Sequence, residues 1–152
     1  QGGAHCHGAD EFQVVVEGKG KLGRHDLTPV SVHFARAYTP YGPLFPDKEV
    51  GWGFLTLRVR LNPDGTQRIP AATEKLKKIP NRKPWQASTH VSLEAKGLND
   101  VPELRDDQGL FVQTLNLAPG ESATCRAPSP IRRSARMSRS SSSARARKKR
   151  RR

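Results

Sequence analysis

The chain has 152 residues, of which 34% are hydrophobic and 27% charged, and its formal net charge is +13. This length suits one domain of ordinary size, and no apolar run approaches the ~18 residues of a membrane-spanning helix, which excludes a helical membrane protein. A collagen period, heptads and a repeat array are absent from the sequence as well.

The N-terminal part of the chain predicts two strands. Residues 1–11 are rich in Gly and His, and we expect a flexible lead-in. Residues 12–17 (FQVVVE) contain three adjacent valines and predict a strand that ends at residues 18–23. In residues 30–38, Val32 and Phe34 alternate with side chains such as His33, which is the pattern of a half-buried strand. A loop with three prolines follows.

Residues 52–61 (WGFLTLRVRL) form the clearest strand of the sequence. Because side chains alternate between the two faces of a strand, the more apolar set is expected to be buried. The set expected to be buried is Leu55, Leu57, Val59 and Leu61. The set expected to face solvent is Phe54, Thr56, Arg58 and Arg60.

The rest of the body predicts a hairpin, one helix and two strands. Residues 62–65 (NPDG) favour a turn, so that residues 66–69 return as the second arm of a hairpin. Pro70 and Pro80 limit a helix at residues 71–79 to two or three turns. Residues 86–95 alternate again, and residues 110–117 predict the last strand.

These five or six short strands indicate an all-β fold, a sandwich or a small open barrel, with one short helix. We expect the β-rich globular domain to cover residues 12–120 and a disordered Arg/Ser-rich basic tail to cover residues 121–152. Two cysteines, Cys6 and Cys125, are too few for a disulfide scaffold and favour a reducing compartment, although a disulfide between them stays open.

Nearly all the excess positive charge lies at the C-terminus. Residues 1–125 hold 15 Lys/Arg and 14 Asp/Glu, whereas residues 126–152 hold 12 Lys/Arg and no acidic residue. Such a segment cannot bury enough apolar surface to fold alone, but each cation that neutralises a phosphate releases counterions and adds affinity. The residues that we expect to bind nucleic acid are Arg132, Arg133, Arg136, Arg139, Arg145, Arg147, Lys148, Lys149, Arg150, Arg151 and Arg152.

The same tail fits two further roles. Arg132-Arg133 and the basic cluster at 145–149 are separated by eleven residues, the spacing of a bipartite nuclear localisation signal. Serines at 134, 138 and 140–143 lie among arginines, and phosphorylation there would cancel most of the charge. In composition, residues 126–152 resemble the arginine/serine stretches of nucleocapsid and capsid arms and of splicing-type proteins. This resemblance implies a nucleic-acid partner and names no family.

Three short motifs in the body favour ordinary structural roles. Residues 18–23 match G-x-G-x-x-G, but no helix follows to bind a pyrophosphate, so a basic hairpin loop is expected. His5-Cys6-His7 lacks the partner spacing of a zinc site. His90-Val91-Ser92 is one H-x-S unit, where a two-histidine phosphoesterase needs two. We therefore expect no catalytic residue, no metal site and no cofactor.

The sequence favours a nucleic-acid-binding protein, with RNA preferred over DNA, located in the nucleus or in a virion and the host cytoplasm. Its β domain would serve interaction or assembly, including a homo-oligomer, and its partners would be nucleic acid and a nuclear import receptor. Arg58 and Arg60 share a strand face with Phe54, and the cations at residues 75–83 lie near Trp85, which suits binding of single strands. A solvated strand face and a charged helix are the favoured interpretation of both regions. Two alternatives stay open: a secreted protein that binds heparan-type polysaccharide, and a small hydrolase.

Overall fold

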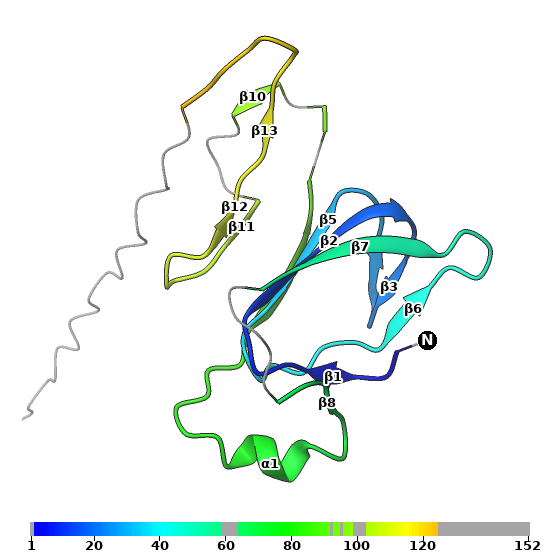
Figure 1. Cartoon of the computed structure of the whole chain (residues 1–152), viewed down its shortest axis with the longest axis vertical. Coiled ribbons are helices and arrows are strands. Elements are labelled where there is room, and N and C mark those ends of the chain that lie inside the picture. Colours follow the sequence, from blue (N-terminus) through cyan, green and yellow to red (C-terminus); the bar gives the residue numbers. More distant parts are fainter. Residues whose placement is uncertain (1, 59–63, 92, 95, 99–102, 125–152) are drawn as a thin grey trace, which may run out of the picture.

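The computed structural model describes residues 2–58, 64–91, 93–94, 96–98 and 103–124, and it confirms the predicted all-β class (Figure 1). In these residues thirteen short strands form five small antiparallel sheets, none of them closed, beside one helix. No helix in the described ranges is long and apolar enough to cross a membrane.

The main sheet has four strands in the order β7-β2-β5-β9, and every neighbouring pair is antiparallel. Its strands are β2 (Glu11–Gly18), β5 (Ser31–Ala35), β7 (Trp52–Arg58) and β9 (Gln86–His90). The central strand β5 is buried along its whole length. On one face of the sheet, Phe12 lies between Phe34 of β5 and Leu57 of β7.

A second sheet of three strands, in the order β4-β3-β6, packs against the other face. Its strands are β3 (Gly20–Leu22), β4 (His25–Leu27) and β6 (Leu44–Pro46). The apolar core between the two sheets consists of Val15, Leu22, Leu27, Ala35 and Tyr41. A Cβ atom at Gly20 would lie 2.7 Å from both the Phe45 carbonyl oxygen and the Trp52 ring, so only glycine permits this close approach.

The helix belongs to a lobe at the lower end of the molecule (Figure 1). Here β1 (His5–Cys6) pairs with β8 (Gln67–Arg68), and α1 (Thr73–Lys77) follows. Cys6, which is fully buried, packs with Ala72 and Leu76 in a small core of its own. Residues 1–11 were expected to be a flexible lead-in, yet their described part supplies a strand and a core side chain. The reason is a pairing with a segment about sixty residues away, which local composition cannot reveal.

Two short hairpin-like pairs form the C-terminal end of the described chain. Strand β10 (Gly97–Leu98) pairs with β13 (Leu115–Asn116), and β11 (Leu104–Arg105) pairs with β12 (Phe111–Val112). Asp106 closes the tighter turn by accepting the backbone N–H groups of Gln108 and Leu110 at 2.7 and 2.9 Å. The strand predicted at residues 110–117 is therefore divided into β12 and β13.

The predicted burial of Leu55 and Leu57 in β7 is wrong, whereas the predicted exposure of Phe54, Thr56 and Arg58 is confirmed. Leu55 and Leu57, expected in the core, are 55% and 54% exposed, whereas Arg58 lies opposite the buried Glu11. Apolar and polar side chains do alternate along β7, but this alternation does not specify which face of the strand is buried. Glu11 and Gln13 of the neighbouring strand β2 are buried, and they lie opposite Arg58 and Thr56, which stay exposed. The predicted core residues Val59 and Leu61, and Arg60, lie outside the described residues.

Candidate functional site

A buried carboxylate organises a polar network on the inner face of the main sheet. Glu11 is 1% exposed. Its Oε2 accepts a hydrogen bond from Arg58 Nε at 2.7 Å, and its Oε1 accepts one from the Tyr41 hydroxyl. Gln13 Nε2 donates to the same hydroxyl at 3.1 Å. Burial and, after it, the bond to Glu11 raise the pKa of Tyr41 far above its ordinary value, so Tyr41 stays a phenol. The network ties β2 and β7 to the segment that carries Tyr41.

A second polar contact joins β5 and β9 beside this network. His33 is 2% exposed, and its Nδ1 lies 2.9 Å from Ser88 Oγ. Burial lowers the pKa of His33 from 6.5 to about 4, against the opposing charge of Glu11, so the ring is neutral near pH 7. Both residues line a hollow of about 460 Å³ together with Arg24 and His25.

A serine bonded to a histidine invites comparison with an activated nucleophile. That arrangement needs a third group to orient the histidine and a base whose pKa is near the working pH. Among the residues that the structure describes, nothing hydrogen-bonds His33 Nε2. Together with a pKa of about 4, this geometry suits a contact between strands. The structure adds no support for a phosphoesterase site at the H-x-S unit. His90 Nδ1 lies 3.4 Å from Ser31 Oγ, and Ser92 lies outside the described residues.

The His5-Cys6-His7 cluster does not converge on one point. Strand alternation turns Cys6 toward Leu76 of α1, while the rings of His5 and His7 contact each other with centroids 5.2 Å apart. No group of three potential ligands gathers within the described ranges. Burial raises the pKa of the Cys6 thiol, an effect that the charges of Arg82 and Lys75 oppose. Cys125 lies outside the described residues.

Residues 18–23 were expected to form a basic hairpin loop, but Gly20–Leu22 form strand β3, one arm of a hairpin. Strand β3 pairs with β4, and the turn between them uses Gly23 at a φ of 59°. Its lysines are not free cations, because Lys19 lies 3.6 Å from Asp47 and Lys21 lies 3.1 Å from Asp26. These ion pairs weaken any attraction of this loop for phosphate.

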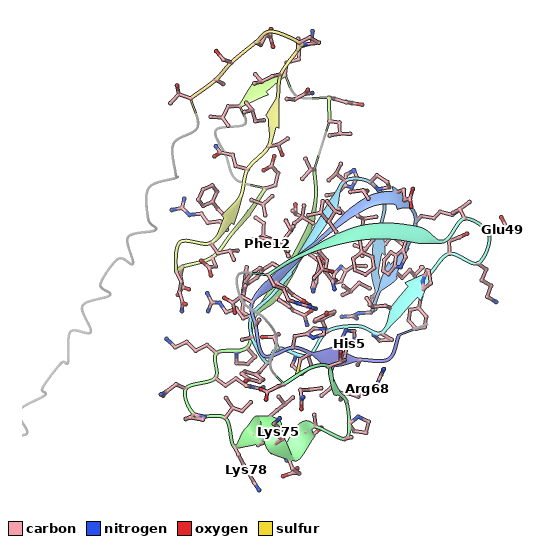
Figure 2. The ribbon with its side chains drawn as sticks, viewed as in Figure 1. His5, Phe12, Glu49, Arg68, Lys75 and Lys78 are labelled. Atoms are coloured by element: carbon pink, nitrogen blue, oxygen red, sulfur yellow. The ribbon has the colours of Figure 1, made fainter. Side chains whose placement is uncertain are left out.

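The lobe around α1 carries most of the uncompensated positive charge of the described body. Figure 2 shows Arg68, Lys75 and Lys78 on this lobe. Lys77 lies 2.6 Å from Glu74, and Lys75 lies 3.7 Å from Asp64. The other cations of the lobe are Arg68, Lys78, Arg82 and Lys83, and no carboxylate of the described residues lies within 4.0 Å of their charged atoms.

Trp85 lies next to these cations in the sequence, but its ring already contacts other side chains of the body. The ring packs against Phe34 with centroids 5.6 Å apart, and the Arg36 guanidinium lies over it at 5.6 Å. Arg36 also forms an ion pair with Asp106, whose side chain is 3% exposed. Trp85 therefore joins the main sheet to the C-terminal hairpins and is not presented for base stacking.

The eleven tail residues predicted to bind nucleic acid, Arg132 to Arg152, all lie outside the described residues. Within the described part, sequence reasoning missed the Glu11–Arg58–Tyr41 network and the Arg36–Asp106 pair. Their only sequence signal is a charged residue at the end of an apolar strand. Comparison with known protein families, curated proteins and solved structures finds no match to this chain.

Proposed function

We propose that this chain binds nucleic acid, RNA in preference to DNA, through sequence-independent contacts between its basic tail and backbone phosphates. The observation that carries the proposal is the segregation of charge: residues 126–152 hold 12 Lys/Arg and no acidic residue, against a net charge of +1 for residues 1–125. A polycation of this density gains affinity by releasing condensed counterions from a polyanion. Arginine adds two-donor contacts to single phosphates.

The β body then serves as an interaction or assembly module that the tail anchors to nucleic acid. This combination suits a capsid or nucleocapsid-type protein and a nuclear RNA-associated protein. The bipartite spacing of basic clusters in the tail supports recognition by a nuclear import receptor in the second case.

Purification of the full chain with its bound polyanion tests the proposal. We expect RNA to copurify at low salt, to be lost after ribonuclease treatment, and to be displaced at high salt. A matched full-length variant, with the eleven predicted cations changed to Gln, should lose the RNA. Copurification of sulfated polysaccharide in place of RNA, or equal RNA retention by the neutral variant, would refute the proposal.

A further inference from the structure

The cations of the described body are concentrated on one lobe. Residues 64–85 carry six Lys/Arg and two Asp/Glu, a net charge of +4. Because residues 1–125 as a whole carry only +1, the remainder of the body carries −3. A polyanion that approaches the body is therefore attracted to this lobe and repelled by the rest.

Three cations of the lobe are available to a ligand. Lys78 and Lys83 are exposed and Arg82 is half-buried, and no carboxylate of the described residues pairs with these three side chains. By contrast, Lys19 and Lys21 on the opposite hairpin are already bound to aspartates. The basic segments around residues 19–21 and 78–83 look alike in the sequence. Only the tertiary contacts show which of them has cations without carboxylate partners.

Two of these cations line a hollow in the surface. A depression of about 320 Å³ lies between the segment after α1 and the start of the main sheet, and Arg82 and Lys83 line it. Its other charged groups are Arg36, which pairs with Asp106, and Asp10, whose carboxylate accepts the N–H of Ala37 at 2.7 Å and offsets one of the two lysine and arginine charges. The net charge left for a ligand is positive, which suits a phosphate group.

We propose that Lys78, Arg82 and Lys83 form a second phosphate-binding surface, which holds the backbone of single-stranded nucleic acid while the tail binds elsewhere along the strand. This inference rests on the proposed function and adds a structured contact to it. The surface contacts the backbone and not the bases, because the half-buried Trp85 ring already packs against Phe34 and the Arg36 guanidinium. Binding should therefore be independent of base sequence.

The test compares two full-length variants that lose the same charge. The first is K78Q/R82Q/K83Q. The control is K19Q/K21Q/K48Q, whose three lysines line one hollow between the β3–β4 hairpin and the segment after β6. Each variant is titrated with fluorescein-labelled oligouridine over a range of salt concentrations. For the lobe variant we expect the slope of log affinity against log salt to fall by about 2, from three contacts at roughly 0.7 each. The control should change the slope by less than half as much.

Equal changes in the two variants would show that net charge alone matters and would overturn the inference, as would an unchanged slope for the lobe variant. Lysine acetylation of the unmodified full chain gives a check that needs no variant. Oligouridine should protect Lys78 and Lys83 from acetylation and leave Lys19 and Lys21 reactive. If neither Lys78 nor Lys83 is protected, the inference is overturned as well.

If the unmodified chain does not bind oligouridine, the proposed function itself fails. If it binds and only the tail-neutral variant loses affinity, the function stands and the lobe surface does not.

Discussion

Single side chains in this protein show how a polar interior is made stable. Glu11 is buried almost completely, and its charge is met by Arg58 from the neighbouring strand and by the Tyr41 hydroxyl. A buried ion pair of this kind adds little net stability over an apolar pair, but removal of one partner is costly because the other charge stays buried. The role of Arg58 is thus structural, although its residue type and strand face suggested a free surface cation.

We predict that Arg58→Met lowers the free energy of unfolding by about 3 kcal/mol, because the Glu11 carboxylate loses its charged partner. Urea denaturation at neutral pH measures this change. The matched control is Leu57→Ala in the same strand, where the leucine is 54% exposed; it should cost less than about 1.5 kcal/mol. A larger cost at Leu57 than at Arg58 would contradict the observed faces of β7.

His33 makes stability depend on pH. Burial lowers the pKa of His33 from 6.5 to about 4, so between these values the unfolded chain binds a proton that the native protein does not. This effect of His33 on the unfolding free energy is fully present above pH 6.5 and is lost as the pH falls toward 4. The unfolding free energy falls by about 3 kcal/mol between these two pH values.

We therefore predict that His33→Gln flattens the pH dependence of the unfolding free energy between pH 6.5 and 4, measured by urea denaturation at several pH values. Part of the dependence should remain, because burial also lowers the pKa of His7. An unchanged slope in the variant would mean that His33 is protonated in the native protein.

At the scale of secondary structure, α1 depends on tertiary contacts. It has five residues between two prolines, and no side chain caps its N-terminus. A helix this short is unstable in isolation. Leu76, which is 4% exposed, holds it against Cys6 of β1, and β1 is itself held by two residues of β8. The lobe that carries the basic surface is thus stabilised by few apolar contacts.

We predict that Leu76→Ala costs about 2–4 kcal/mol and that the loss is local. Hydrogen exchange should show reduced protection in residues 64–85 and unchanged protection in β2 and β5, since these strands belong to a separate core. The control Lys78→Ala, at an exposed position of the same lobe, should leave both regions unchanged. Equal loss of protection in β5 would show that the two cores unfold together.

At the scale of the whole molecule, the chain joins a nearly neutral β body to a strongly cationic tail. The two apolar cores and the polar networks described here draw on residues before position 111. The tail has one Ile, one Met and no aromatic residue to add to a core.

We predict that the body folds without the tail. A chain that ends at Cys125 should keep the β-sheet circular dichroism spectrum of the full chain and its cooperative thermal unfolding, because the composition of the tail offers almost no apolar side chain for a core. Loss of the β signal after this truncation would mean that the tail completes the fold.

The tail should act through the number of its charges and not through their order. Replacement of its cations in pairs by Ala should lower the salt slope of nucleic-acid binding by roughly 0.7–0.9 per lost contact. A scrambled tail of the same composition should bind as well as the natural one. If scrambling lowers affinity severalfold, the tail recognises its partner by sequence and not by charge.

The sequence alone determined the all-β class, the proline-bounded helix and the position of the charge. These features depend on local rules, namely alternation, turn residues and composition, and such rules operate within a few residues of one another. What the tertiary structure decided is that the leucine face of β7 is exposed while Arg58 pairs with a buried carboxylate, that Cys6 is a core residue, and which lysines are free. Each of these outcomes depends on a partner far along the chain, Glu11 for Arg58, Leu76 for Cys6 and Asp47 for Lys19. Strand register and long-range ion pairing determine these partners, and a local sequence pattern specifies neither the register nor the ion pairs.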